Sequence, residues 1–329
     1  MKPKRTASEI TGMGAAVPEK VLTNFELAKM VDTSDEWIRS RTGIRERRIA
    51  EDNETTSEYG HRAARVALDQ AGLSPKDLDL IIVGTVTPDM CFPSTACFIQ
   101  ERLGAVNAAA FDVSAACAGF IYSLSLADGM IAAGKYKNIL VLGVELLSRI
   151  TNWQDRSTCV LFGDGAGAAV LQPSQGDRGI VKTYIRSDGR LNHLLKMPGG
   201  GTIFPPGQEA HNGECFIQME GREVFRHAVN CMGEAATKII EENGFTGDEI
   251  SLVIPHQANI RIIEAVAKRL DVPNERVYIN VDRFGNTSSA SIPIALHEAQ
   301  QRGLINRNDL VLLVGFGGGF TWGSALIRF

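Results

Sequence analysis

The chain of 329 residues contains an internal repeat, and its second half carries the same order of helix ends, acidic turns and apolar strands as its first. Residues 72–83, a helix end followed by an acidic turn and a buried strand, align with residues 244–255. The period of about 170 residues is far longer than that of a solenoid repeat. The repeat therefore predicts a duplicated α/β unit, with two similar halves packed as one body.

Strands and helices alternate along both halves. Residues 78–85 form a near-continuous apolar run, which is typical of a strand buried on both faces of a parallel sheet. A helical pattern over residues 56–71 precedes this strand and ends at Gly72. Residues 197–214 are rich in glycine and proline and predict a surface loop. We expect an N-terminal half over residues 1–175 and a C-terminal half over residues 176–329.

Composition narrows the class of protein. The formal net charge of −4, with 44% apolar and 22% charged residues, argues against a general nucleic-acid-binding protein. No apolar run reaches membrane-spanning length, and no apolar segment follows the basic N-terminus as in a signal peptide. The six cysteines form no CxxC pair and have no zinc-site spacing. We therefore expect a cytoplasmic protein with free thiols, no metal site and no nucleic-acid or membrane partner.

Cys117 has a sequence position that suits a nucleophilic thiol. Cys117 follows the strand-like run 108–113 and a turn of small residues, and it precedes a helical pattern over residues 118–133. The unpaired N–H groups and positive dipole of a helix N-terminus favour a thiolate over a thiol. Small neighbours also leave room for a substrate carbonyl. The alternative is that Cys117 is a small buried apolar residue, as many free cysteines are.

Two polar residues of the second half occupy comparable turns. His256 follows the buried strand that ends at Pro255, and the carboxyl ends of such strands gather catalytic groups. Alone, it could equally be a hydrogen-bonded loop histidine. Asn286 lies in the turn that the repeat aligns with the Cys117 turn. We expect Cys117 and Asn286 to fall opposite each other near a pseudo-two-fold axis. A Cys/His/Asn set suits thiolate acyl chemistry.

These motifs resemble a known family. SAACAGF around Cys117, PHQAN around His256 and GNTSSAS around Asn286 resemble the Cys-His-Asn triad of the β-ketoacyl-acyl-carrier-protein synthase III family. Residues 33–48, 92–97, 162–171 and 316–329 also match. The family initiates type II fatty acid synthesis, whereas elongating condensing enzymes use two histidines. The resemblance implies a thiolase-like α/β fold, with duplicated βαβαβαββ halves in a five-layer αβαβα arrangement.

The resemblance also implies a mechanism. Cys117 would take a short acyl group, most simply acetyl, from acyl-CoA, with the oxyanion held by the N–H groups of Cys117 and Gly318. Malonyl-acyl carrier protein would then lose CO₂, and His256 and Asn286 would stabilise its enolate. The enolate would attack acyl-Cys117 and give a 3-oxoacyl-carrier protein. No metal or redox cofactor is required, because decarboxylation drives the reaction.

Binding roles follow from the same resemblance. The residues that it assigns to CoA are Trp37, Arg41, Arg156 and Asn259. Those that it assigns to the acyl pocket are Phe92, Leu147, Phe162 and Phe316. The basic residues that it assigns to carrier-protein docking are Arg226, Arg261, Lys268 and Arg269. Phe92 would reach across a homodimer interface to close the pocket of a second copy. Without the family, the basic helix that carries Trp37 and Arg41 would be interpreted as a solvated surface helix. The helix over residues 259–270 would likewise be an exposed helix, stabilised by a Glu264–Lys268 pair.

Three alternatives remain at this stage. Residues 163–168 fit G-x-G-x-x-A, but they lead into a strand rather than a helix, so a dinucleotide site is not predicted. Tight turns beside the substrate thioester, or simple hairpin geometry, explain these glycines and Gly317–Gly319 better.

The chain could instead be a related condensing enzyme or acyltransferase of secondary metabolism. A non-catalytic scaffold would be indicated if Cys117 failed to accept an acyl group.

Overall fold

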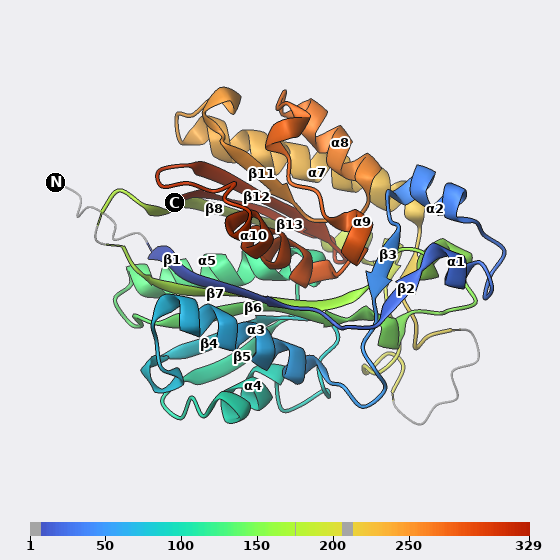
Figure 1. Cartoon of the computed structure of the whole chain (residues 1–329), viewed down its shortest axis with the longest axis horizontal. Helices are drawn as coiled ribbons and strands as arrows, with labels where there is room; N and C mark the ends of the chain where they lie inside the picture. The colour runs from blue at the N-terminus through green and yellow to red at the C-terminus, as the bar shows by residue number, and fades with distance from the viewer. Residues whose placement is uncertain (1–7, 175, 206–212) are drawn as a thin grey trace.

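The computed structural model describes residues 8–174, 176–205 and 213–329, and its helices and sheets form five layers (Figure 1). The first sheet has the order β1-β7-β6-β4-β5. Strand β4 runs parallel to β5 and β6, whereas β7 is antiparallel to β6 and β1. Its strands are β1 (Ser8–Ala16), β4 (Leu80–Gly84), β5 (Ala109–Val113), β6 (Ile139–Leu146) and β7 (Asp164–Pro173).

The second sheet repeats this order as β8-β13-β12-β11. Its strands are β8 (Gly179–Ser187), β11 (Leu252–Pro255), β12 (Leu310–Gly317) and β13 (Thr321–Arg328). The counterpart of β5 is reduced to one isolated bridge between Val253 and Val277. The two sheets therefore have equivalent topologies, and the first half alone completes its fifth strand.

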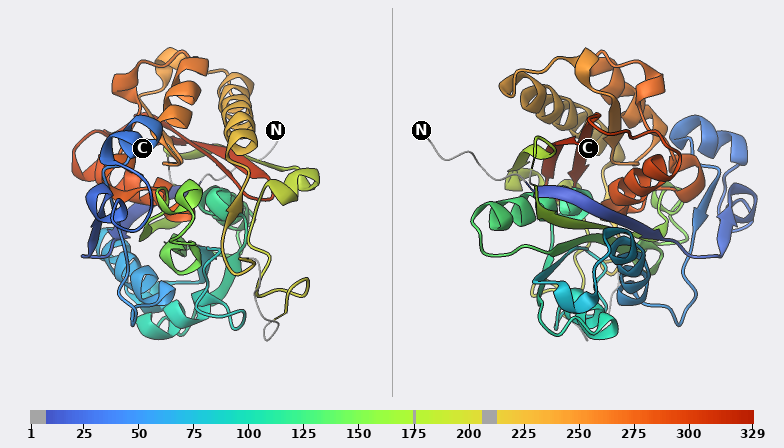
Figure 2. Two further views of the ribbon diagram at one scale, coloured as in Figure 1. Left: turned by 90° about the vertical axis from the view of Figure 1, so that its right-hand side faces the viewer. Right: turned by 60° about the vertical axis from the view of Figure 1, so that its left-hand side comes forward.

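Helices cover both outer faces and fill the space between the sheets (Figures 1 and 2). The outer helices are α3 (Thr56–Ala71) and α4 (Thr95–Leu103) on the first sheet, and α7 (Gly221–Glu242) and α8 (Ile260–Arg269) on the second. The central pair is α5 (Gly119–Ala132) and α10 (Ser291–Gln301). The five-layer αβαβα arrangement is the one predicted from the sequence.

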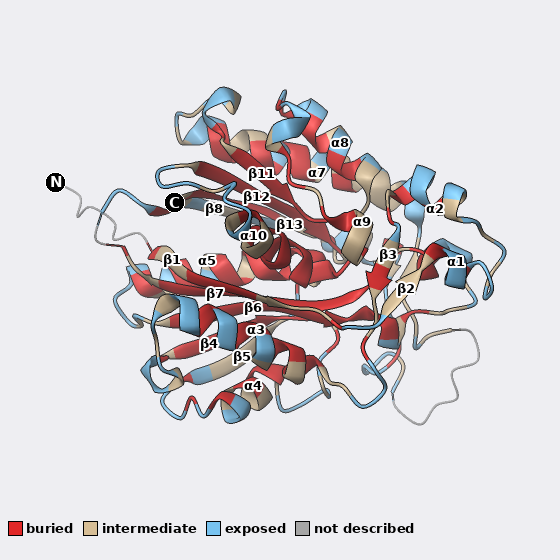
Figure 3. Cartoon of the chain, viewed as in Figure 1, coloured by how far each residue is buried: buried red, intermediate tan, exposed pale blue. Residues whose placement is uncertain are grey.

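The central helices are buried on most sides because a sheet lies above and below them (Figure 3). Helix α5 accordingly buries Phe120, Ile121 and Leu124 rather than a single stripe. One apolar cluster joins residues of both halves, among them Ile82 of β4 and Leu313 of β12. The halves therefore share a core and form one body.

Short elements complete the fold beside the two sheets. They are β2 (Val21–Thr23), α1 (Asn24–Leu27), α2 (Asp35–Thr42), β3 (Glu46–Arg48), α6 (Arg156–Cys159), β9 (Leu195–Lys196), β10 (Gln218–Met219) and α9 (Val281–Phe284). Helix α2 begins after Ser34, whose hydroxyl caps it by accepting a hydrogen bond from the Trp37 N–H at 3.1 Å. Among the described residues, no helix is long and apolar enough to cross a membrane.

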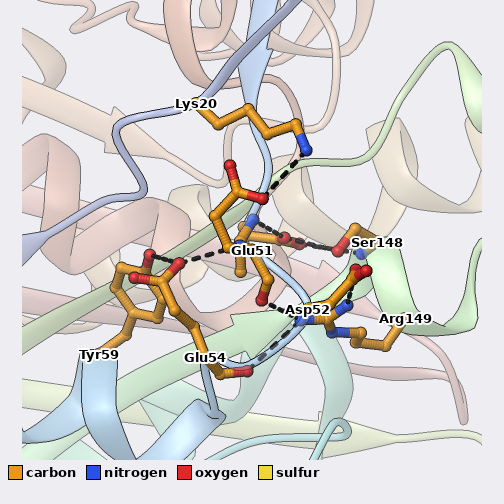
Figure 4. Close-up of polar contacts among 9 residues, drawn as sticks. Lys20, Glu51, Asp52, Glu54, Tyr59, Ser148 and Arg149 are labelled. Atoms are coloured by element: carbon orange, nitrogen blue, oxygen red, sulfur yellow. Dashed lines mark hydrogen bonds and ion pairs between the residues drawn. The ribbon is translucent and has the colours of Figure 1, made fainter.

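A polar network fixes the loop between β3 and α3 (Figure 4). Lys20 forms an ion pair with Glu51 at 3.2 Å, and the Tyr59 hydroxyl donates to the Glu54 carboxylate. Arg149 donates to the Glu51 carbonyl and approaches Asp52 at 3.4 Å. Arg149 belongs to a short 3₁₀ turn, Leu147–Ile150, that also forms part of a cavity wall described below. The network therefore anchors that wall.

The glycine-rich segment that follows Phe162 lies largely within β7 rather than in a turn beside the substrate. A Cβ at Gly167 would meet Pro293 and Ile294 at 2.7 Å. These glycines allow close packing of α10, a helix of the other half, against β7. The prediction that they approach the substrate is therefore wrong for this segment, because the contact is between the two halves.

Candidate active site

Cys117 lies in a tight turn between β5 and α5. A 3₁₀ turn, Ala116–Ala118, precedes α5, and Ala116 has a φ of +43°, which is rare for a residue with a side chain. The turn rests on the second sheet, because a Cβ at Gly315 of β12 would lie 3.4 Å from the Cys117 carbonyl oxygen. The nucleophile candidate is thus held by backbone contacts from the opposite half.

The second half builds an equivalent turn before α10. A 3₁₀ turn, Ser288–Ala290, begins with Ser288 at a φ of +48°. It rests on the first sheet, because a Cβ at Gly143 of β6 would lie 2.2 Å from the Ser289 carbonyl oxygen. The match of Ala116 with Ser288 aligns Cys117 with Ser289. The predicted pairing of Cys117 with Asn286 is therefore wrong by three residues, because Asn286 precedes the turn.

His256 follows the last residue of β11 and is almost completely buried. Its backbone N–H donates to the Val314 carbonyl of the neighbouring β12 at 2.8 Å, which continues the parallel ladder. Its Nδ1 lies 2.7 Å from the Ser291 hydroxyl oxygen, and that oxygen accepts a bond from the Gln257 N–H at 3.3 Å. This arrangement favours donation from the Ser291 hydroxyl to Nδ1. The Nε2–H then remains free to donate into the site.

Asn286 is buried and held on both sides. Its backbone bonds to Leu161 and Gly163 at 2.8 and 3.0 Å in a parallel bridge opposite Phe162. Its side-chain Oδ1 accepts the Ser288 N–H at 2.9 Å. With the oxygen occupied, the NH₂ group is the part of the carboxamide left to donate. Asn286 and His256 are therefore both set up as hydrogen-bond donors, which a developing enolate oxygen requires.

Burial determines the charge state of the resting site. It raises the pKa of the Cys117 thiol to about 12, although a hydrogen bond with Ser288 opposes this shift. It lowers the pKa of His256 to about 3, so the imidazole is neutral near pH 7. The thiolate that the sequence leads us to expect at the helix N-terminus is therefore disfavoured in the resting site, because burial raises the pKa of the thiol.

Two cavities meet at Cys117. The first, of about 470 Å³, brings together Cys117, His256 and Asn286. The second, of about 330 Å³, extends from Cys117 to the opposite side, and Gly318 and Ser288 lie in its wall. Phe162 and Leu195 line both cavities and separate them around the sulfur. One thiol thus faces two chambers, as expected for a group that receives an acyl chain from one side and holds it on the other.

Two of the four residues predicted to bind CoA line the first cavity, and the other two form a stacked pair at α2. Arg41 and Asn259 line the cavity directly. The guanidinium of Arg156 stacks over the Trp37 ring at 5.0 Å, and Trp37 lies one helical turn before Arg41 on α2. Asn259 also caps α8, since its Oδ1 accepts the Ile262 N–H at 3.0 Å. An aromatic–guanidinium pair one helical turn from Arg41 suits a base that carries phosphates.

Three of the four residues predicted for the acyl pocket line the cavities at Cys117. Leu147 lines the second cavity, Phe316 lines the first, and Phe162 lines both. Phe92 lines neither of these two cavities, and its side chain is 84% exposed. Part of the predicted loop 197–214 lies outside the described residues, but Met197 contributes to the second cavity. The second cavity is also lined by apolar residues that the sequence had not singled out: Val86, Ile150, Leu195 and Ile217.

The predicted basic docking residues lie on α7 and α8. All four are exposed: Arg226, Arg261, Lys268 and Arg269. Arg261 lines the first cavity and stacks over the Phe225 ring at 5.4 Å. Arg226 pairs with Glu223 at 2.6 Å, and Arg269 donates to the Asn230 side chain at 3.2 Å. Of the four predicted docking residues, Arg261 is the one that lines the first cavity.

Three polar residues of the site were missed in the sequence. Ser288 and Ser291 orient Asn286 and His256, and Glu145 of β6 accepts bonds from the Ser288 and Ser289 hydroxyls at 3.0 Å. The serines lay inside the GNTSSAS match, but a hydroxyl in a turn has no distinctive spacing. Glu145 lay inside an apolar strand, and its isolation there was the one available signal.

Comparisons with known proteins agree with this geometry. Family models for 3-oxoacyl-[acyl-carrier-protein] synthase III match residues 111–189 and, for its C-terminal part, residues 240–329. A β-ketoacyl-[acyl-carrier-protein] synthase III of Caldanaerobacter subterraneus is 53% identical over 326 residues, covering 99% of this chain and 98% of that protein.

Solved structures are similarly close. The 3-oxoacyl-[acyl-carrier-protein] synthase III of Aquifex aeolicus is 51% identical, with a TM-score of 0.92 over 98% of this chain and all of that one. The priming β-ketosynthase of the R1128 polyketide pathway is 37% identical, with a TM-score of 0.91 over 100% of this chain and 98% of that one. The duplicated fold and the full-length identity together show that the chain belongs to the β-ketoacyl-acyl-carrier-protein synthase III family.

Proposed function

We propose that the protein is the initiating condensing enzyme of fatty acid synthesis, which joins a short acyl-CoA primer, most simply acetyl-CoA, to malonyl-acyl carrier protein. The observation that carries this proposal is the convergence of Cys117, His256 and Asn286 on one cavity. The chain is 53% identical to a synthase III over nearly its full length, but 37% identical to the priming β-ketosynthase of the R1128 polyketide pathway. This difference favours fatty acid synthesis over a secondary-metabolite pathway.

In the first half-reaction, the Cys117 sulfur attacks the thioester carbonyl and CoA departs as a thiolate. The backbone N–H groups of Cys117 and Gly318 would stabilise the tetrahedral oxyanion. Support for this role comes from the shared cavity of Cys117 and Gly318 and from the hairpin turn that presents Gly318. The acyl chain then occupies the 330 Å³ cavity.

In the second half-reaction, malonyl-acyl carrier protein loses CO₂. The Nε2–H of His256 and the NH₂ of Asn286 donate to the thioester oxygen and stabilise the enolate. Its carbon attacks acyl-Cys117 and releases a 3-oxoacyl-carrier protein. The neutral imidazole is consistent with a donor role, because a neutral His256 carries one ring N–H. The reaction requires no metal or redox cofactor.

The proposed partners follow from exposed surfaces. The basic residues of α7 and α8 would dock an acidic carrier protein beside the cavity entrance, and Arg261 would lie between the two. A homodimer would cover Phe92 and bring it to the acyl chamber of a second copy, which would limit primer length. A cytoplasmic location is consistent with six free thiols.

Mass spectrometry of the intact protein after incubation with a series of acyl-CoAs tests this function. We expect one acetyl or propionyl group on the peptide that contains Cys117, and no label from long-chain acyl-CoAs. Subsequent addition of malonyl-acyl carrier protein should remove the label and release CO₂. No label from any acyl-CoA would overturn the proposal and would favour a non-catalytic scaffold.

A further inference from the structure

Glu145 is a completely buried carboxylate to which the reaction outlined above gives no role. It lies on β6, directly before the Leu147–Ile150 turn. No ion pair compensates its charge among the residues that the structure describes; instead, hydroxyl and amide groups surround it. Its Oε2 accepts bonds from the Val86 N–H at 3.1 Å and the Thr87 hydroxyl at 2.8 Å. A buried ionisable group without a cation is costly and calls for an explanation.

The other carboxylate oxygen faces the turn before α10. Oε1 accepts hydrogen bonds from the Ser288 and Ser289 hydroxyls, each at 3.0 Å. Ser288 and Cys117 line the same 330 Å³ cavity, and the Ser288 hydroxyl opposes the rise in the pKa of the Cys117 thiol. The Ser288 hydroxyl is therefore bonded to the carboxylate and shares a cavity wall with the sulfur. Ser289 shares the carboxylate contact but lines neither of the two cavities that meet at Cys117.

The other titratable group beside the sulfur is a poor proton acceptor. His256 approaches from the end of β11, but burial lowers its pKa to about 3 and its Nδ1 is occupied by Ser291. Burial acts in the opposite direction on Glu145 and raises its pKa, which makes its carboxylate a stronger base than one exposed to water. Between the two groups, Glu145 is thus the better acceptor for the thiol proton.

We propose that Glu145, acting through the Ser288 hydroxyl, accepts the Cys117 proton when the nucleophile forms; this inference rests on the proposed condensing function. The thiol proton passes to the Ser288 oxygen as the Ser288 proton passes to Oε1. The sulfur then forms its bond to the acyl carbon, the bond from that carbon to the CoA sulfur breaks, and the CoA thiolate takes a proton from solvent.

The same path operates in reverse at the end of the cycle. The enolate carbon forms a bond to the acyl carbon, and the bond from that carbon to the Cys117 sulfur breaks. Oε1 returns its proton through Ser288 to the departing thiolate. Glu145 is a positioning residue in this scheme, because it acts through Ser288 and touches neither the acyl group nor the sulfur. The proton is held inside the protein while the acyl-enzyme waits for its second substrate.

The rate of Cys117 alkylation by iodoacetamide, followed by mass spectrometry of its peptide from pH 6 to pH 10, tests this path without a CoA substrate. We expect Glu145→Gln to lower the rate at pH 7 by about 100-fold, within the range of general-base effects. Its rate should rise tenfold per pH unit, because only hydroxide then forms the thiolate. The wild-type rate should depend on pH less steeply.

Two serine variants provide the matched comparison. Ser288→Ala removes the link to Cys117 and should reproduce the pH profile of Glu145→Gln, even if the latter fails to fold. Ser289→Ala removes an equal bond to Glu145 but should keep the wild-type profile. Glu145→Gln or Ser288→Ala proteins that react as fast as wild type, with the same pH dependence, would overturn the inference. Failure of the wild-type protein to accept any acyl group would instead overturn the proposed function.

Discussion

The turn before α5 and the turn before α10 have the same backbone but different chemistry. Ala116 and Ser288 adopt nearly the same left-handed conformation, and each turn rests on a glycine of the opposite sheet, Gly315 or Gly143. The first turn carries the thiol, whereas the second carries hydroxyl groups and follows Asn286. Duplication therefore supplied two equivalent supports, and later divergence divided the nucleophile from the hydrogen-bond donors.

The strands beneath the turns differ in the same way. Gly317 of β12 lies against the Cys117 turn, and a Cβ there would stand 2.4 Å from the Cys117 nitrogen. The equivalent position of β6 is Glu145, whose carboxylate binds the hydroxyls of the second turn. One turn thus excludes any side chain beneath it, and the other is built around a carboxylate. The following substitutions test how far the two turns have become specialised.

Replacement of the thiol should have the largest effect. Cys117→Ser should lower condensation by about 10⁴-fold or more, because the hydroxyl does not ionise in a buried site and loss of a nucleophile removes the covalent intermediate. The rate of condensation and the extent of acyl labelling at residue 117 measure the loss. Cys231→Ser, at a half-buried thiol whose pKa burial also raises to about 11, is the control and should retain activity. Substantial turnover by Cys117→Ser would remove the thiol from the mechanism.

Loss of the donor before the second turn should have the next largest effect. Asn286→Ala should lower condensation by about 10²- to 10³-fold, the usual cost of one oxyanion donor. The matched control is Asn274→Ala, in an exposed turn, which should remain near wild type. Steady-state release of CO₂ from malonyl-acyl carrier protein is the measurement. Near-wild-type release by Asn286→Ala would exclude Asn286 from the site.

Removal of the group behind His256 should have a smaller effect. Ser291→Ala should lower kcat about fivefold, because a neutral hydrogen bond contributes about 1 kcal/mol and fixes the imidazole orientation. Ser291→Thr keeps the hydroxyl and should recover most of this loss. Acylation of Cys117 should be unchanged in both variants. If alanine and threonine behave alike, the hydroxyl does not orient His256.

The smallest effect concerns stability. Ala116→Gly should raise the free energy of unfolding by up to about 1 kcal/mol, because glycine adopts a positive φ without strain. Ala118→Gly, at a φ of −87°, should lower it by about 0.5–1 kcal/mol. Urea denaturation measures both. Destabilisation of equal size in the two variants would show that the left-handed residue carries no strain.

The sequence predicted the layers and the elements more fully than the site. Residues 56–71 and the cap at Ser34 were predictable because helix periodicity and capping are local. The three-residue error in the pairing of Cys117 with Asn286 could not be foreseen, because the pairing depends on where each 3₁₀ turn begins. The protonation of Cys117 and His256 depends on burial by both halves, and no local pattern records it. Glu145 and Ser288 meet only after the halves pack.

The central claim is that Asn286 serves the decarboxylation half-reaction and not the acylation of Cys117, and Asn286→Ala tests it most directly. Its rate of acetylation by acetyl-CoA in a single turnover should be compared with its rate of CO₂ release from malonyl-acyl carrier protein. We predict acetylation of Cys117 within about threefold of wild type, together with a loss of CO₂ release of at least about 100-fold. An equal fall in both rates would contradict the assignment of Asn286 to decarboxylation alone.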